Sequence, residues 1–245
     1  MSSIIQFEIE TLSNLFIGGA PVPFEIGGID QQTILDPDGF PYIPGSSLKG
    51  ALRAIVSQDK SPVAEEIKML YTDYLKNQKE KNVERIREIV EQQYKDISSR
   101  KETLDRIERN YTKAEEKLSA EYLFGIEGFN NSPKLLFNDV LLCEKDRNKR
   151  TCFSIDMKNS IEDQNGIAPV SNPRTYQTAR KGLNFAGEIR LYGMMEYWDQ
   201  ASAELCRRYV MEQLLKFNEG IHRLGNSKSR GYGKVEVRIV EEMKA

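Results

Sequence analysis

The chain has 245 residues, of which 39% are hydrophobic and 29% charged, and its formal net charge is −2. This composition is typical of a globular protein that is long enough to bury a core. No apolar run is long enough to span a bilayer, and the first residues lack the pattern of a signal peptide, so we expect a cytoplasmic protein without membrane contact. The net charge alone argues against nucleic-acid binding, because such domains are usually basic.

The cysteines and the histidine exclude several kinds of site. Cys143, Cys152 and Cys206 are scattered without a CxxC pair, which argues against a disulfide framework and against a cysteine zinc site. His222 is the single histidine, so a metal site or an acid–base mechanism that needs two histidines is excluded.

The first half of the chain predicts a strand, a short helix and a long helical insertion. Residues 3–12 alternate apolar and polar side chains, as a strand does, and a turn-rich stretch with Gly27-Gly28 follows. Ser46 or Ser47 is expected to cap the short helix. Residues 60–120 or thereabouts predict the insertion, with coiled-coil-like apolar spacing and a bend at Ser98-Ser99. We favour a solvated helix pair packing on its own domain over a dedicated partner helix.

The second half predicts three strands and one helix. The strands are expected at residues 134–142, 185–198 and 234–240, and an amphipathic helix at 201–217, ending near Gly220. Residues 144–180 are polar and predict a loop, with turns at Asn165-Gly166 and Asn172-Pro173. The order of elements predicts one α+β domain over residues 1–245, with helices on one face of an antiparallel sheet.

A first motif, residues 43–53, combines a Pro-Gly entry with two serines at the start of a helix. Ser46 and Ser47 would offer hydroxyl and amide donors at a helix N-terminus, where anions bind. Lys49 and Arg53 are four residues apart and so share a helix face. An ordinary capped helix with two surface cations is an equally good interpretation of this motif alone.

A second motif, residues 224–234, is dense in glycine, serine and cations. Gly225 and Gly231 would let the backbone approach a ligand closely, and Lys228 and Arg230 supply positive charge. Tyr232 is a candidate for stacking on a base. The pattern favours anion binding over a plain flexible loop, although the spacing of a P-loop is absent.

Together the two motifs resemble the RAMP superfamily of CRISPR proteins. The resemblance extends to Gly18-Gly19, to residues 25–30, to Phe124-Gly125, to residues 136–139 and to residues 158–185. It looks very like the backbone subunit of type III effector complexes, which cleaves target RNA, and covers most of the chain outside residues 60–120.

The resemblance implies a modified RRM-like, ferredoxin-like fold with a protruding hairpin. It also implies copies of the subunit stacked as a filament along a guide RNA, together with target RNA and other subunits of the effector complex. Cleavage in the family depends on an aspartate after the first strand, and Asp30 falls at that place. The implied chemistry is metal-dependent endoribonuclease cleavage, with Asp30 helping to hold Mg²⁺ or Mn²⁺. Asp36-Pro37-Asp38-Gly39 is interpreted as a plain turn.

The resemblance assigns RNA-binding roles to residues of both motifs and of the hairpin. Guide-backbone contacts are expected from Ser46, Ser47, Lys49, Arg53, Gly225, Lys228, Arg230 and Gly231, and Arg174 is expected near the hairpin.

Three other functions stay open on the sequence. The first is a non-cleaving RNA-binding subunit in which Asp30 is a loop residue. The second is a metal-independent guide-processing enzyme that would use His222, although a lone histidine at such a place is more often structural. The third is a scaffold whose coiled-coil insertion carries its function.

Overall fold

A computed structural model describes residues 3–19, 29–93, 97–164 and 167–240. The chain falls into two compact units. Unit 1 comprises Met1–Leu52, Phe137–Arg190 and Met211–Ala245, and unit 2 comprises Arg53–Leu136 and Leu191–Val210. The turns expected at Gly27-Gly28 and Asn165-Gly166 lie outside the described residues, and a single domain over 1–245 stays a prediction.

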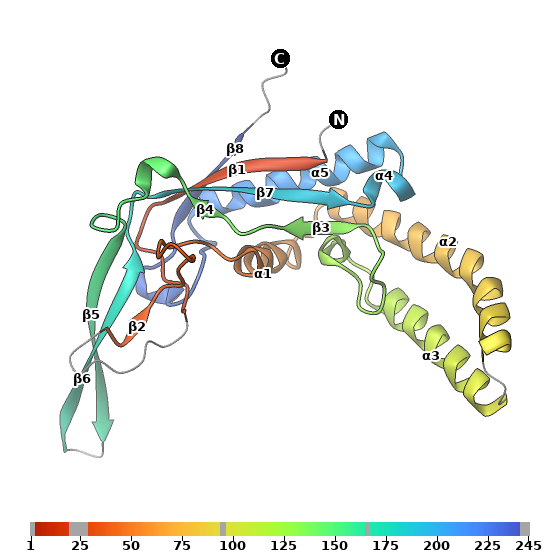
Figure 1. Ribbon diagram of the computed structural model, residues 1–245, viewed down its shortest axis with the longest axis horizontal. Coiled ribbons are helices and arrows are strands. Elements are labelled where there is room, and N and C mark those ends of the chain that lie inside the picture. The colour runs from red at the N-terminus through yellow and green to blue at the C-terminus, as the bar shows by residue number, and fades with distance from the viewer. Residues whose placement is uncertain (1–2, 20–28, 94–96, 165–166, 241–245) are drawn as a thin grey trace. The chain divides into compact units, whose positions relative to one another are not determined.

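The main sheet has the connectivity of a ferredoxin-like fold (Figure 1). Its strands are β1 (Ile4–Thr11), β3 (Lys134–Phe137), β4 (Leu141–Leu142), β7 (Asn184–Tyr192) and β8 (Val235–Val240). The order is β3-β7-β1-β8, with β4 also paired to β7, and β1 is antiparallel to both neighbours. With α1 (Gly45–Val56) after β1 and α5 (Gln200–Leu215) after β7, this is a split β-α-β-β-α-β arrangement. The predicted α+β fold with an antiparallel sheet is confirmed.

Alternation along β1 gives the sheet one apolar and one polar face. Ile5, Phe7 and Ile9 are fully buried, and the residues between them are more exposed. Leu48 and Leu52 of α1 are also fully buried, as expected of a helix that covers the apolar face of a sheet.

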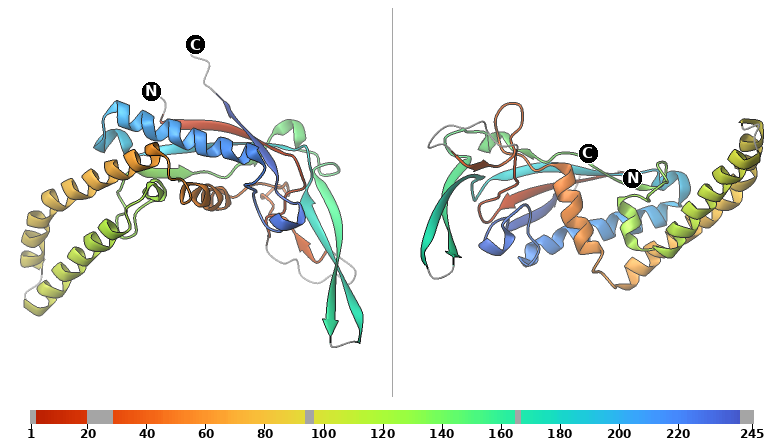
Figure 2. Two further views of the ribbon diagram at one scale, coloured as in Figure 1. Left: turned by 180° about the vertical axis from the view of Figure 1, so that it is seen from behind. Right: turned by 90° about the horizontal axis from the view of Figure 1, so that it is seen from below.

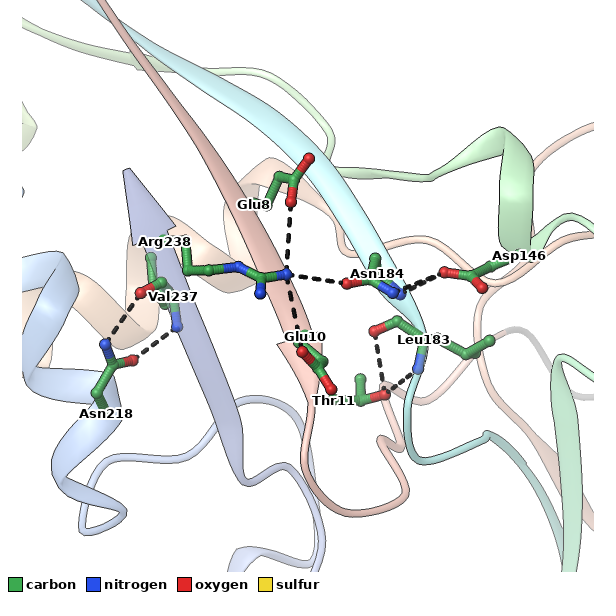
Figure 3. Close-up of polar contacts among 9 residues, drawn as sticks. All are labelled: Glu8, Glu10, Thr11, Asp146, Leu183, Asn184, Asn218, Val237 and Arg238. Atoms are coloured by element: carbon green, nitrogen blue, oxygen red, sulfur yellow. Dashed lines mark hydrogen bonds and ion pairs between the residues drawn. The ribbon is translucent and has the colours of Figure 1, made fainter. Parts of the chain in front are cut away.

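The opposite face of the sheet is held by one arginine (Figure 3). Arg238 on β8 lies 3.5 Å from Glu8 and 3.7 Å from Glu10, and it donates a 3.2 Å hydrogen bond to Asn184. Strands β8, β1 and β7 therefore share a polar network across this face. Its excess of carboxylates disfavours the binding of a polyanion there.

The outer edge of β8 is partly closed by a side chain (Figure 3). Asn218, in the 3₁₀ helix η3 (Lys216–Glu219), donates to the carbonyl of Val237 at 2.9 Å and accepts from its N–H at 2.6 Å. The side-chain amide of Asn218 takes the place of a neighbouring strand at Val237, which protects an edge strand from pairing with another chain.

A second sheet corrects the prediction of a loop at residues 144–180. β5 (Phe153–Gln164) and β6 (Ile167–Ala179) form a long antiparallel hairpin, and the short strand β2 (Gln31–Gln32) pairs with β6 in parallel (Figure 1). The stretch is polar overall, because a hairpin with little core behind it needs few buried apolar residues, and such a composition favours the prediction of a loop. Ile155 and Met157 are 64% and 80% exposed.

Three further expectations need correction. Asn172-Pro173 lies inside β6 and is not a turn. The strand expected at 185–198 ends at Tyr192, and Gly193, with a φ of 70°, leads into α4 (Met194–Tyr197). The strand expected at 134–142 is divided into β3 and β4.

Unit 2 is built on two long helices, as predicted for the insertion (Figure 2). These are α2 (Pro62–Gln93) and α3 (Ile97–Glu116), and they contact each other. Ser98 and Ser99 lie within α3, so they are not the bend, and residues 94–96 between the helices lie outside the described residues. In the described part of the chain, no helix is both long and apolar enough for a membrane span.

An aromatic cluster holds the base of α2 in this unit. Tyr71 is fully buried, makes edge contacts with Tyr122 at 5.8 Å and Trp198 at 5.1 Å, and donates to the carbonyl of Pro133 at 2.9 Å. The insertion is thus anchored by packing at its base, as expected of a helix pair that packs on its own domain.

Candidate nucleic-acid interface

The glycine-rich motif forms a tight loop against the segment that follows β1. The 3₁₀ helix η4 (Lys228–Arg230) is bracketed by Ser227 and Gly231, both with positive φ. Gly225 also has a positive φ, and a Cβ on it would lie 2.3 Å from the carbonyl oxygen of Phe16. Glycine is therefore required at 225 by both conformation and space.

The loop presents its polar residues to solvent. Lys228, Ser229 and Arg230 are exposed, and Lys228 and Ser229 line a hollow of about 470 Å³ together with Arg223. Arg223 is held there because it donates to the carbonyl of Lys228 at 3.1 Å. Two cations, Arg223 and Lys228, beside a hollow bordered by backbone in a left-handed turn are suited to an anion such as phosphate.

Tyr232 does not stack on a base, contrary to the sequence-based expectation. Its side chain is buried with Phe16 and Tyr176, and its hydroxyl donates to Oδ2 of Asp156 at 2.7 Å. Tyr232 is a packing residue because its ring is buried with two other aromatic rings and its hydroxyl is bonded to Asp156.

The helix of the first motif starts at least two residues earlier than expected. Helix α1 begins at Gly45, so Ser46 and Ser47 lie within its first turn and are not its cap. The carboxylate of Asp139, 94 positions along the chain, accepts from the N–H of Gly45 at 2.8 Å and so serves one of the first-turn donors. Ser46 is exposed and Ser47 half-buried.

The two cations of this motif lie in different surroundings. Lys49 is half-buried and belongs to unit 1. Arg53 belongs to unit 2, where its Nε lies 2.9 Å from Glu121. An RNA phosphate at Arg53 would have to compete with, or share, this carboxylate.

Asp30 is exposed and stands directly before β2, alongside β6 of the hairpin. Its backbone N–H donates to the carbonyl of Thr175 at 3.0 Å, and its Oδ2 accepts from the N–H of Thr175 at 2.6 Å. Arg174, also exposed, is the neighbouring residue on β6. The structure therefore brings the predicted catalytic residue and the predicted hairpin arginine to one place.

The turn of Asp36 and Asp38 is a structural feature, as predicted. Asp36 accepts from the N–H of Phe40, and Arg147 pairs with Asp36 at 3.3 Å and with Asp38 at 2.8 Å. Both carboxylates hold their loop against the rest of unit 1.

Asp156 on β5 was missed by the sequence interpretation. Its carboxylate accepts from Tyr232, Asn14, Ser154 and Thr178. Burial by itself would raise the pKa of Asp156, but these hydrogen bonds outweigh it and hold the pKa below its ordinary value. A lone aspartate in a polar stretch gives no signal of such a cluster, because three of its four partners, Asn14, Thr178 and Tyr232, are remote in sequence.

No metal-binding cluster occurs among the described residues, in the sense of three or more His, Cys, Asp or Glu side chains close together. Asp30 supplies one carboxylate, which is a ligand type that suits Mg²⁺ or Mn²⁺. A cation at this place would need most of its other ligands from a bound molecule or from water.

The fold and the site define a ferredoxin-like protein with a cationic loop and a hairpin beside its main sheet. The model of the RAMP superfamily matches residues 8–236, and the chain belongs to this superfamily. This confirms the resemblance drawn from its motifs.

Particular relatives are similar over nearly the whole chain. One is the CRISPR system Cms endoribonuclease Csm3 of Methanothermobacter thermautotrophicus, 26% identical over 97% of this chain and 84% of the relative. The protein of the same name from Streptococcus thermophilus is 27% identical over 98% of this chain and 86% of the relative.

A solved structure shows the same fold. One chain in the cryo-EM structure of the Type III-B Cmr-beta bound to cognate target RNA aligns with a TM-score of 0.54 at 19% identity. The alignment covers 97% of this chain, which spans 59% of that longer chain.

Proposed function

We propose that this chain is a backbone subunit of a type III CRISPR effector complex, which binds guide RNA and cleaves complementary target RNA. Its membership of the RAMP superfamily and its similarity to two endoribonucleases support the proposal. The observation that carries the cleavage step is the position of Asp30, an exposed carboxylate held in the same unit as the cationic loop.

The guide backbone is held by the two motifs. Lys228 and Arg230 neutralise phosphates of the guide, and Gly225 and Gly231 let the protein backbone approach these phosphates closely. Ser46, Ser47, Lys49 and Arg53 of α1 contact further phosphates, and Arg174 contacts the RNA near the hairpin. These contacts touch no base edges, so the guide is bound with little sequence preference, and target choice is left to base pairing.

Cleavage is a transfer within the target RNA. The 2′-oxygen of a ribose attacks the adjacent phosphorus, and the bond from phosphorus to the 5′-oxygen of the next nucleotide breaks. The 2′-hydroxyl loses its proton and the leaving 5′-oxygen gains one, so the products carry a cyclic phosphate and a 5′-hydroxyl.

Asp30 acts at the cleaved phosphate. The N–H of Thr175 fixes one carboxylate oxygen, and a carboxylate has lone pairs for further ligands. Bound Mg²⁺ or Mn²⁺, held by Asp30 and RNA oxygens, would stabilise the negative charge that develops on the phosphate. Asp30 therefore orients the site more than it reacts itself.

The partners follow from this role. They are guide RNA, target RNA, other subunits of the effector complex and further copies of this chain stacked along the guide. A cytoplasmic location belongs to the same proposal.

The test is cleavage of a guide-complementary RNA by the assembled complex. Asp30→Ala should lower the rate by at least about 100-fold and leave guide binding intact, and a chelator should abolish cleavage by the wild type. Asp38→Ala is the matched control, since Asp38 is an exposed aspartate of a neighbouring loop.

Other outcomes would point to the other functions. If the wild type binds guide tightly but never cuts, the chain is a structural subunit and Asp30 only closes the turn with Thr175. Cleavage that persists in chelator would instead direct attention to His222.

A further inference from the structure

Tyr232 links the cationic loop to the interior of unit 1. It follows directly after Gly231 at the end of the loop, and its ring is buried against Phe16 and Tyr176. Phe16 and Tyr176 are in edge contact, with ring centroids 5.3 Å apart. The loop therefore cannot shift without moving a ring inside a packed aromatic cluster.

Asp156 joins this cluster to the base of the hairpin. Oδ2 accepts from the hydroxyl of Tyr232 at 2.7 Å and from Asn14 at 3.1 Å. Ser154 and Thr178, on β5 and β6, donate to the same carboxylate at 3.0 and 3.3 Å. One side chain thus connects the loop, the segment after β1 and both strands of the hairpin.

Two adjacent residues of β6 connect the cluster to Asp30. The ring of Tyr176 packs in the cluster, and the backbone of Thr175 exchanges hydrogen bonds with Asp30 at 3.0 and 2.6 Å. Strand β2, which starts at the next residue, pairs Gln31 with Tyr176. A displacement of Tyr176 therefore reaches the Asp30 carboxylate through a single intervening residue, Thr175.

We propose that Tyr232, Asp156 and Tyr176 are positioning residues, which set the place of the Asp30 carboxylate relative to the guide-binding loop. The inference rests on the proposed function and deepens it. The guide is bound at the loop end of this connection, and the target is cleaved at the Asp30 end. The connection therefore determines which target phosphate lies at Asp30. A misplacement of about 1 Å at a reacting group is enough to slow a reaction by up to about 100-fold.

The test removes a single hydrogen bond of this connection. Tyr232→Phe removes the hydroxyl bonded to Asp156 and keeps the ring in its cluster. Tyr71→Phe is the matched control, because it also removes the hydrogen bond of a buried tyrosine hydroxyl, but in unit 2.

Three quantities are measured on each variant in complex with guide RNA. They are the dissociation constant of the guide, the rate and position of target cleavage, and hydrogen exchange of the Thr175 amide. We expect Tyr232→Phe to slow cleavage by about tenfold, to spread the cut over neighbouring phosphates, and to speed exchange at Thr175. Guide affinity should change by less than about threefold, and Tyr71→Phe should behave as the wild type.

Two results would overturn the inference. One is that the Thr175 amide exchanges hydrogen at the same rate in Tyr232→Phe as in the wild type, which would mean that the loop and Asp30 are not connected. The other is an equal loss of guide binding and cleavage, which a merely structural role would produce. If the wild type does not cleave, the proposed enzymatic function fails, while exchange at Thr175 still decides whether the connection exists.

Discussion

At the scale of single residues, the carboxylate of Asp156 matters both for the hydrogen bonds that it accepts and for the charge that it carries. It accepts hydrogen bonds from four side chains, and these keep its pKa low in spite of burial. The charged form is thus favoured by the folded protein, and this preference contributes to stability.

Asp156→Asn should destabilise the protein by about 2–3 kcal/mol at neutral pH, since it weakens several charge-assisted hydrogen bonds and turns an amide donor toward other donors. Urea unfolding measures the change. Asp38→Asn, at an exposed carboxylate, should cost less than about 1 kcal/mol. Equal losses in both variants would show that the Asp156 cluster adds no stability.

The sign of the pH dependence follows from the lowered pKa of Asp156. Its contribution is complete above the unfolded pKa of about 3.9 and is lost as the pH falls through the folded value. The gap in stability between the wild type and Asp156→Asn should therefore be constant above about pH 5 and narrow below about pH 4. A gap that widens in acid would contradict the cause given for the shift.

At the scale of elements, the glycine-rich loop depends on backbone conformation as much as on charge. Gly225 and Gly182 both have positive φ, but a Cβ at Gly182 would meet nothing within 4 Å, whereas one at Gly225 would meet the carbonyl of Phe16. Alanine substitutions at these two positions therefore separate the energetic cost of a positive φ from that of the close approach to Phe16.

We expect Gly182→Ala to cost about 1 kcal/mol and Gly225→Ala about 1–3 kcal/mol more, because the loop must move away from Phe16. Gly225→Ala should also weaken guide binding, while Gly182→Ala should not. Urea unfolding and a binding titration measure the two effects. The same affinity in both variants would mean that the position of this loop is unimportant for the guide.

At the scale of the whole molecule, we expect that the outer part of the helical insertion can be removed without loss of the fold, because its two helices contact each other. Tyr71 anchors the base of α2, and Lys79 pairs with Glu115 at 3.2 Å farther along the two helices. The two helices run antiparallel (Figure 2), so positions 86 and 108 are each seven residues beyond this ion pair along their helices.

Replacing residues 86–108 by a short glycine–serine linker should therefore leave the fold and the guide affinity within about twofold of the wild type. The measurements are a melting curve and a guide-binding titration. A loss of guide binding in a folded variant would show that the insertion itself contacts RNA. Unchanged guide binding with failed assembly of the complex would show that it serves another subunit.

Much of this fold could be predicted because its local patterns are strong. The alternation of residues 3–12 identified β1, the helical periodicity identified the insertion, and Gly220 marked the end of the helical region after α5. The hairpin β5–β6 was not predicted from pattern, because the stretch is polar overall and its described part exposes apolar Ile155 and Met157 while it buries polar Thr178. Its existence was implied only by the resemblance.

The candidate site divides in the same way. The loop cations were identified from a motif, which is short and contiguous, and Asp30 was identified through the resemblance. The partners of these motifs were not, because Asp139 lies 94 residues from Gly45, and Asn14 lies 142 residues from Asp156. The burial of Tyr232 depends on Phe16 and Tyr176 in the same way.

The sequence by itself determined which segments form helices and core strands, where the cationic motifs lie and to which superfamily the chain belongs, since each of these depends on neighbouring residues. Only the tertiary structure decided that Tyr232 faces inward, that Asp156 collects four donors and that Thr175 holds Asp30. The physical reason is that a hydrogen bond or a packed ring needs a partner within a few ångströms. Chain connectivity does not specify that partner until the sheets have formed.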